Sequence, residues 1–172
     1  MQRLGIRILF AQFILFFIFS NSYSQDSLLY PSLPPGMKAP CIKGNDETGK
    51  SFSLAKIKSR YTLLYFYEVH CHLCEVVTPR LKELYDSYHK IGLEVIAIPI
   101  ESNREEWMAY IVEKGLTWKN IFPADNKKAR LKSDYKLEVS PTMYLLDRKK
   151  ILLTQRLGRV DLVEEELNQR IR

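Results

Sequence analysis

The sequence has only three cysteines and three histidines in 172 residues, and it contains no internal repeat. Three cysteines are too few for a small scaffold held together by disulfides, and an apolar fraction of 46% is enough for an ordinary core. A structural zinc site is poorly supplied too, because Zn²⁺ takes four ligands and only Cys41 and His89 lie outside the segment 68–79 as candidates. The close pair Cys71 and Cys74 must therefore be explained by chemistry.

Long apolar runs are scarce as well. The run Ile8 to Phe19 has twelve residues and is interrupted by Gln12, whereas a membrane span needs about 20. Arg3 and Arg7 precede it and small residues follow it, which predicts a signal peptide over residues 1–24. An uncleaved anchor is the alternative. The protein is thus expected in the periplasm or otherwise outside the cytoplasm.

The net charge of +6 does not indicate a nucleic-acid partner. The basic residues are scattered among acidic ones, as in "SNREEW" and "VEEELNQR". We therefore expect no binding of nucleic acid.

Hydrophobic periodicity predicts one domain over residues 39–172, after an extended, proline-rich lead-in at 25–38. Two short strands are expected around a polar turn, Gly44 to Gly49. The elements expected next are a buried strand at 61–68, a helix at 76–90 that contains Pro79, a buried strand at 92–101, a helix opened by Ser102 with Glu105 as capping partner, a short helix at 126–135, a hairpin at 142–157 and a helix opened by Asp161. Strands that alternate with helices indicate a parallel core, to which the hairpin adds an antiparallel part.

The stretch "EVHCHLCEVVTP", residues 68–79, carries the candidate chemistry. Cys71 and Cys74 follow a buried strand and lie at the start of a helix, where unpaired N–H groups carry partial positive charge. Such a place stabilises a thiolate and lowers its pKa below the ~8.5 of a free thiol. We therefore expect Cys71 to be the attacking thiol and Cys74 to be the buried partner that resolves a mixed disulfide.

The neighbours of this pair have two interpretations each. His70 and His72 tune the pKa of Cys71 when protonated, or they are exposed polar groups. Glu68 is a partly buried carboxylate that moves protons, or it is a solvated strand end. Cys41 is expected to be a small apolar core residue and not a third redox thiol.

Two nearby thiols have other uses in proteins. Covalent haem needs a histidine directly after the second cysteine, and Glu75 stands there. A structural disulfide that closes so short a loop adds little stability. Copper bound by "HCHLC" stays open, because thiolates and imidazoles suit copper. We expect no cofactor and no bound metal.

Several segments together resemble the thioredoxin fold: the strand "YTLLYFY", the "CHLC" motif, Pro79 five residues after the second cysteine, and "YKLEVSPTMYLLD". With the signal peptide, the chain resembles the extracytoplasmic TlpA/ResA-like family. The resemblance implies an α/β, thioredoxin-like fold with a central mixed sheet flanked by helices and an N-terminal strand extension. It also implies a cis-proline at Pro141, in a loop opposite Cys71 where Ser140 and Thr142 help to bind a substrate strand.

The resemblance further implies an enzyme, a thiol-disulfide oxidoreductase that reduces protein disulfides with its CxxC pair. Its electrons would come from a membrane-bound donor, and it would act as a monomer. A copper-binding chaperone on the same fold is the alternative, although no histidine follows His89. The chain departs from the family pattern at several positions: among them, Val77 replaces a glutamate found in cytochrome-maturation members, and Tyr65 replaces the buried aspartate of thioredoxin.

Overall fold

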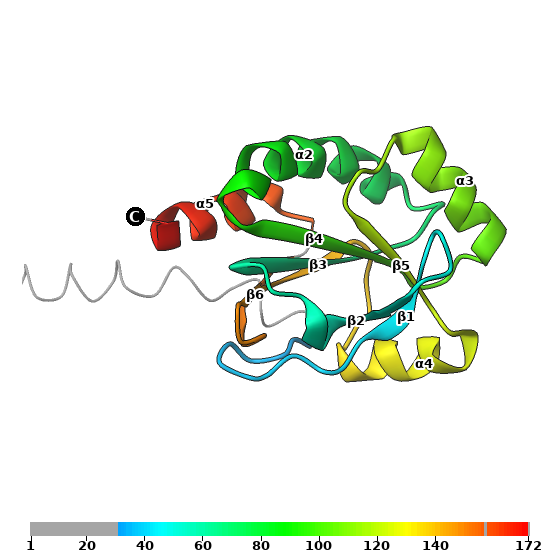
Figure 1. Ribbon diagram of the computed structural model, residues 1–172, viewed down its shortest axis with the longest axis horizontal. Helices are drawn as coiled ribbons and strands as arrows, with labels where there is room; N and C mark the ends of the chain where they lie inside the picture. The colour runs from blue at the N-terminus through cyan, green and yellow to red at the C-terminus, as the bar shows by residue number, and fades with distance from the viewer. Residues whose placement is uncertain (1–30, 157, 172) are drawn as a thin grey trace, which may run out of the picture. The chain divides into compact units, whose positions relative to one another are not determined.

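The computed structural model of the protein describes residues 31–156 and 158–171, and Ser32–Arg172 form one compact unit (Figure 1). In this part of the chain, a seven-stranded sheet has the order β2-β1-β5-β4-β3-β6-β7. The strands are β1 (Lys43–Asp46), β2 (Ser51–Ser53), β3 (Tyr61–Tyr67), β4 (Leu93–Pro99), β5 (Lys119–Pro123), β6 (Thr142–Asp147) and β7 (Leu152–Arg156). Because β3 pairs in parallel with β4 and antiparallel with β6, the sheet is mixed.

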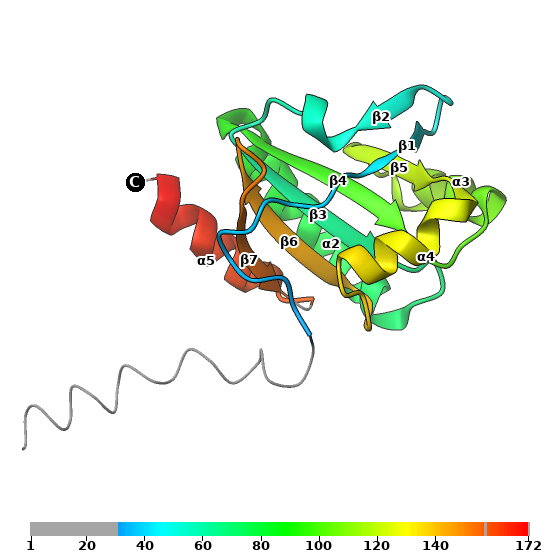
Figure 2. The same cartoon turned by 90° about the horizontal axis from the view of Figure 1, so that it is seen from below.

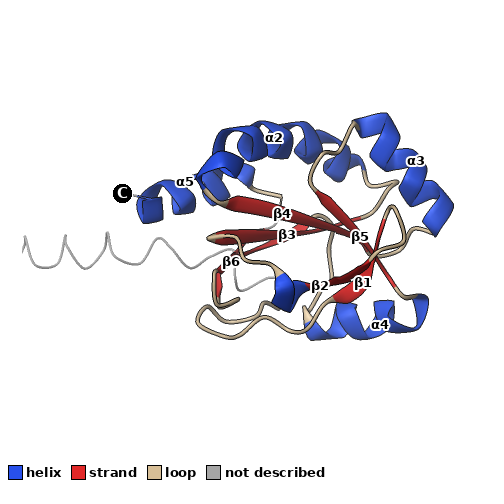
Figure 3. Ribbon diagram, in the orientation of Figure 1, coloured by secondary structure: helices blue, strands red, loops and turns tan. Residues whose placement is uncertain are grey.

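Helices cover both faces of this sheet (Figures 1 and 2). On one face lie α2 (His72–Tyr88), α3 (Arg104–Lys114) and α5 (Val160–Ile171), and on the other lies α4 (Asp125–Asp134). The colours of Figure 3 show the same layering, with the strands between the helices. The predicted α/β, thioredoxin-like architecture is confirmed.

Each face of the sheet has its own apolar core, and β3 contributes to both. Every residue of β3 is buried, as its unbroken apolar sequence predicts. Because side chains alternate along a strand, Tyr65 and Tyr67 join the core under α2, α3 and α5, whereas Leu64 and Phe66 join the core under α4. The strand ends directly before the CxxC motif and so fixes where that motif begins.

The strand β5 corrects the expected order of elements, which has no strand between residues 115 and 126. Only two residue pairs join β5 to β4, and β1 supports its other edge. The two backbones lie so close that a Cβ added at Gly44 would stand 2.4 Å from the Phe122 carbonyl oxygen. This strand is held by tertiary pairing, which a five-residue pattern does not reveal.

Helix α3 begins one residue later than expected. Its N-cap is Asn103, whose side chain accepts the Glu106 N–H at 2.9 Å while the Glu106 side chain accepts the Asn103 N–H. Ser102 is instead buried, and its hydroxyl oxygen accepts the Val69 N–H at 3.3 Å. The capping-box pattern is met twice, by Ser102 with Glu105 and by Asn103 with Glu106. The sequence alone therefore does not show which residue is the N-cap.

Helix α5 likewise differs from expectation at its start. It begins at Val160, so Asp161 lies inside the first turn and does not cap it. The Asp161 carboxylate pairs with the Arg159 guanidinium at 2.8 Å. An acidic side chain in the first turn still complements the helix dipole.

The last part of the proline-rich lead-in packs against the sheet. Leu33 is buried, and the backbones of Gly36 and Met37 exchange hydrogen bonds of 2.8 Å with Leu152. Lys38 forms an isolated antiparallel bridge with Ile151. The signal peptide predicted at 1–24 lies outside the described residues, and the expected domain limits stay predictions. Within the described ranges, no helix has the length and apolar character needed to cross a membrane.

Candidate active site

Cys71 is the N-cap of α2, directly after the turn that follows β3. Its backbone is extended, with φ −89° and ψ 113°, and its Sγ accepts the Cys74 N–H at 3.2 Å. The sulfur therefore takes the place of a capping oxygen at a helix N-terminus, where partial positive charge favours a thiolate. Cys71 is half-buried, whereas its partner thiol is not exposed at all.

Cys74 lies one turn further along α2 and is fully buried. Both cysteines are free thiols in this structure. Burial raises the pKa of Cys74, and the contact with Cys71 adds to the effect. The structure thus separates the two thiols by exposure in the way the sequence predicts.

The loop before β6 faces the first cysteine. The Ser140–Pro141 peptide bond is cis, and the Cys71 thiol donates to the Ser140 carbonyl at 3.6 Å. Thr142 stands at the start of β6, and its hydroxyl donates to the Val139 carbonyl at 2.7 Å. This geometry brings the loop and Cys71 together.

Glu68 connects this loop to the end of β3. The Ser140 hydroxyl donates to a carboxylate oxygen of Glu68 at 3.2 Å, and Glu68 is half-buried. Its negative charge is among the causes that raise the pKa of Cys74. The Glu68 side chain is thus tied to the cis-proline loop by a hydrogen bond.

The two histidines of the motif lie at the surface. The His70 side chain is 80% exposed, and its Nε2 is 3.6 Å from Glu106 Oε1. The His72 side chain is 93% exposed, and its Nδ1 is 4.0 Å from Glu75 Oε2. Each imidazole thus lies close to a carboxylate at the surface.

A set of hydroxyl groups beneath Cys74 was not found from the sequence. The Thr78 hydroxyl donates to the Cys74 carbonyl at 2.8 Å. Tyr65, at the position of thioredoxin's buried acid, has its hydroxyl 3.1 Å from Thr78 Oγ1, and the Tyr110 hydroxyl is equally close. These groups lie on three different elements, so periodicity alone could not group them.

Gly158 is a second residue that the sequence did not single out. It has a left-handed φ of +68°, and an added Cβ would stand 3.4 Å from Pro141 Cγ and 3.7 Å from Leu73 Cδ2. It thus packs closely against the cis-proline loop and the first turn of α2. In the sequence, the only sign of this role was that a glycine stands just before an expected helix.

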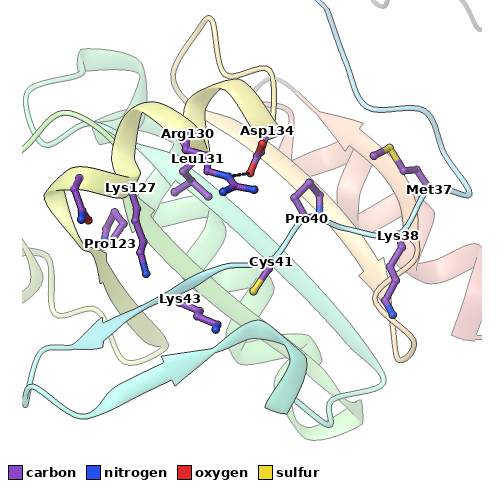
Figure 4. Close-up of a pocket in the computed structure, with 11 residues that line it drawn as sticks. Met37, Lys38, Pro40, Cys41, Lys43, Pro123, Lys127, Arg130, Leu131 and Asp134 are labelled. Carbon is purple, nitrogen blue, oxygen red and sulfur yellow. Dashed lines mark hydrogen bonds and ion pairs between the residues drawn. The ribbon is translucent and has the colours of Figure 1, made fainter.

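Cys41 contradicts its expected place in the core. It is exposed, because the next residue, Ile42, occupies the core position instead. Cys41 lies in a groove of about 780 Å³ beside α4, and Figure 4 shows basic side chains around it. The lining includes Lys38, Lys43, Lys127 and Arg130. Neither Cys71 nor Cys74 lines this groove.

Metal ligands are not gathered in the described part of the chain, where no group of three or more His, Cys, Asp or Glu side chains could hold an ion. The imidazoles of His70 and His72 each lie within 4.0 Å of a carboxylate.

A fold with a free thiol pair at a helix start, facing a cis-proline loop, is that of the thioredoxin class. A family model described as thioredoxin-like matches residues 59–151. The chain belongs to this family.

Curated relatives agree with this class. The chain is 28% identical over 124 residues to the thiol-disulfide oxidoreductase ResA of Bacillus thuringiensis (strain Al Hakam), covering 72% of this chain and 69% of that protein. It is 25% identical over 154 residues to the thioredoxin-like protein YneN of Bacillus subtilis (strain 168), covering 88% and 86%. The expected resemblance to the TlpA/ResA-like family is confirmed.

Solved structures give the same result. The thioredoxin domain of a thiol-disulfide oxidoreductase from Bacteroides vulgatus superposes with a TM-score of 0.76 and 25% identity, over 82% of this chain and 100% of that one. A domain of a possible thiol-disulfide isomerase from Cytophaga hutchinsonii gives 0.70 and 30%, over 83% and 99%. With the curated relatives, these similarities identify the chain as an oxidoreductase.

Proposed function

We propose that this protein reduces protein disulfides outside the cytoplasm with Cys71 and Cys74. One observation carries the proposal: Cys71 is a partly exposed residue whose Sγ caps α2 and accepts the Cys74 N–H at 3.2 Å, while Cys74 is buried. The helix N-terminus favours the ionised sulfur, and exposure makes that sulfur the attacking one.

The reaction has two exchange steps. The Cys71 thiolate attacks one sulfur of a substrate disulfide, and the other substrate sulfur leaves as a thiolate and takes a proton from water. Cys74 then loses its proton and attacks Cys71 Sγ, which releases the second substrate thiolate and forms the Cys71–Cys74 disulfide. Two electrons have passed to the substrate. A membrane-bound dithiol donor returns them to the protein.

The substrate-binding part of this proposal is the loop around the cis bond. In the structure, the Ser140 carbonyl oxygen accepts a hydrogen bond from the Cys71 thiol at 3.6 Å. When Cys71 ionises, this carbonyl becomes free to accept a hydrogen bond from a substrate N–H. An extended substrate strand would pair with the backbone of Ser140 and Thr142 on either side of Pro141. Exposed apolar side chains of Leu73 and Val76 flank the site and would contact the substrate.

Glu68 is proposed to receive the proton of Cys74 at the second step. Its carboxylate is half-buried, affects the pKa of Cys74 and is fixed by the Ser140 hydroxyl at 3.2 Å. His70 and His72 are proposed to act on Cys71 through their charge only, since each is paired with a carboxylate. No metal or other cofactor is needed in this scheme.

The proposed organisation follows the sequence pattern: a signal peptide at 1–24, a lead-in at 25–38 and the redox domain at 39–172. The signal would deliver the protein to the periplasm or an equivalent compartment, where disulfides persist. Relatives named ResA support this assignment. The protein would act there as a monomer.

Trapping tests this function directly. In a Cys41→Ser background, which removes the exposed third thiol, Cys74→Ser should accumulate mixed disulfides with protein substrates on non-reducing gels. Cys71→Ser should accumulate none, because the attacking sulfur is gone. Equal trapping by both variants would refute the assigned roles. The reduction potential then gives the direction: about −270 mV indicates a reductant, and about −120 mV an oxidant.

A further inference from the structure

The helix that carries both cysteines is interrupted close to Cys74. Pro79 lies inside α2 and has no N–H, so the Glu75 carbonyl loses the helix hydrogen bond that it would otherwise accept. Glu75 directly follows Cys74 in the chain. The backbone ladder of α2 is therefore broken one residue after the second cysteine, and the turn that carries Cys74 needs another restraint.

A buried threonine supplies that restraint. The Thr78 hydroxyl donates to the Cys74 carbonyl at 2.8 Å, and Thr78 is 1% exposed. The hydroxyls of Tyr65 and Tyr110 each lie 3.1 Å from Thr78 Oγ1. Because the one hydroxyl proton of Thr78 goes to the Cys74 carbonyl, both phenols must donate to Oγ1, whose two lone pairs are thereby used.

These hydrogen bonds connect Cys74 to two other elements. Tyr65 lies on β3 and Tyr110 on α3, and both are buried. Burial raises the pKa of both phenols, so they stay protonated and keep donating. A buried network in which every hydroxyl is satisfied is rigid. The Cys74 carbonyl is therefore held in place by the strand that leads to Cys71 and by the neighbouring helix.

Cys71 has restraints of its own, since its Sγ accepts the Cys74 N–H at 3.2 Å and lies 3.6 Å from the Ser140 carbonyl oxygen. We propose that Thr78, held by the two phenols, is a positioning residue that keeps Cys74 Sγ aligned for its attack on Cys71 Sγ. A disulfide forms only within narrow geometric limits, and a misplacement of about 1 Å can cost about 100-fold in rate.

The inference rests on the proposed function and concerns its second step. In that step a bond forms between Cys74 Sγ and Cys71 Sγ, the bond from Cys71 Sγ to the substrate sulfur breaks, and that sulfur leaves as a thiolate. The hydroxyls of the network gain and lose no proton or electron.

A single-turnover assay tests this role. Reduced protein, again in the Cys41→Ser background, is mixed with the aromatic disulfide 5,5′-dithiobis(2-nitrobenzoate). The first coloured thiolate is released when Cys71 attacks, at a rate that rises with reagent concentration. The second is released when Cys74 resolves the mixed disulfide, at a rate independent of that concentration. Thr78→Val removes the hydroxyl and keeps the side-chain shape, so it should leave the first phase unchanged and slow the second about tenfold.

Two further variants separate the hydrogen bond from a general loss of packing. Thr78→Ser restores the hydroxyl and should keep the second phase within about twofold of the parent. Tyr65→Phe leaves Thr78 bonded to Cys74 but removes one of its donors, so it should slow the second phase about threefold. This milder variant decides the matter if Thr78→Val does not fold. The slowing should be the same factor between about pH 6 and 8, because alignment changes and ionisation does not.

Two phenols serve as matched controls. The Tyr67 ring stacks on Tyr65 at 5.2 Å and packs against Tyr110 at 5.3 Å, but its hydroxyl has no hydrogen-bond partner among the described residues. Tyr67→Phe should therefore keep both phases. Tyr144→Phe removes a buried hydroxyl on the other face, which donates to the Tyr135 carbonyl at 2.6 Å, and should lower the Tm while keeping the second phase.

Three results would overturn the inference. They are a second phase within about twofold of the parent in Thr78→Val, or an unchanged one in Tyr65→Phe; equal slowing in Thr78→Ser or Tyr67→Phe; and a slowing that disappears as the pH rises. A parent that releases only one coloured thiolate per protein would instead refute the dithiol function.

Discussion

Cys71 and Cys74 lie one helical turn apart but differ in exposure. Cys71 is half-buried at the helix cap, whereas burial raises the pKa of Cys74. In a Cys41→Ser background, we expect iodoacetamide at about pH 6 to modify Cys71 and leave Cys74 unmodified. Peptide mapping by mass spectrometry measures the ratio. Faster labelling of Cys74 would reverse the assigned roles.

Replacing Glu68 distinguishes a purely electrostatic role of its carboxylate from a role as proton acceptor, because the two roles change the rate of resolution in opposite directions. Its charge raises the pKa of Cys74, so Glu68→Gln should speed resolution if charge were its only effect. If the carboxylate receives the Cys74 proton, the same change should slow the step in which Cys74 resolves the mixed disulfide, seen as release of the second coloured thiolate when the reduced protein is mixed with 5,5′-dithiobis(2-nitrobenzoate). We expect slowing of about tenfold or more. Glu75→Gln is the control, because Glu75 is exposed and contacts His72.

The histidines should have a smaller effect. An imidazolium near a thiolate lowers the thiol pKa, but exposed ion pairs contribute little. His70→Ala with His72→Ala should therefore change the rate at which iodoacetamide alkylates Cys71 by less than about fivefold. Peptide mapping by mass spectrometry measures that rate. Loss of tight Cu(I) binding with no change in alkylation would favour the copper alternative instead.

The residue-scale prediction from the sequence was good where chemistry depends on local spacing. Cys71 at a helix start and Cys74 one turn inside it follow from the motif and the preceding strand. The contact among the three hydroxyls of Tyr65, Thr78 and Tyr110 could not be inferred from the sequence, because these residues lie on one strand and two helices. The exposure of Cys41 was also missed, since an apolar neighbour such as Ile42 competes for the same core position.

Among the elements, the loop before α5 and the cis-proline loop meet at Gly158. An alanine there would need a left-handed φ of +68° and would place a Cβ 3.4 Å from Pro141 Cγ. Gly158→Ala should therefore lower the free energy of unfolding by about 1–2 kcal/mol, measured by urea denaturation. Reduction of a protein disulfide should slow as the loop shifts.

Gly49→Ala is the matched control for this substitution. Gly49 also has a positive φ, +88°, but no atom lies within 4 Å of its added Cβ. It should lose similar stability and keep full activity. An equal loss of activity in both variants would show that the effect comes from backbone strain and not from contact with the loop.

The longer elements were predictable because each has a strong pattern of its own. The buried strand at 61–68 appears as β3, Tyr61–Tyr67, and the strand at 92–101 as β4, Leu93–Pro99. Short or ambiguous signals failed. β5 depends on pairing with β1, and the start of α3 depends on which of two adjacent capping boxes forms.

For the whole molecule, the buried tyrosines predict a strong dependence of stability on alkaline pH. Burial raises the pKa values of seven tyrosines, to about 12 for Tyr85 and Tyr144. Folded phenols keep their protons above pH 10 while unfolded ones lose them, so the folded state binds more protons and stability falls as pH rises. Below about pH 9 the phenols are protonated in both states, so the free energy of unfolding keeps its full value with respect to these groups.

The fall should be about 1.4 kcal/mol per pH unit for each phenol that ionises only on unfolding. Urea denaturation between about pH 9 and 11.5 measures the slope. Tyr144→Phe should make this slope shallower by the contribution of one phenol, because the substitution removes one of the hydroxyls whose pKa is raised. A flat profile over this range would contradict the burial of these hydroxyl groups.

Three thiols can in principle form three different disulfides, which is a hazard in an oxidising compartment. The fold reduces the number of disulfides that can form, because the cysteines lie on opposite faces of the sheet. Cys41 lies in the groove beside α4, whereas Cys71 and Cys74 belong to the helix on the opposite face of the sheet (Figures 1 and 4). A disulfide needs Cα atoms within about 7 Å, and the sheet stands between the two groups. Oxidation within the folded chain therefore has one product, whereas a chain oxidised before it folds can be trapped in either wrong pairing.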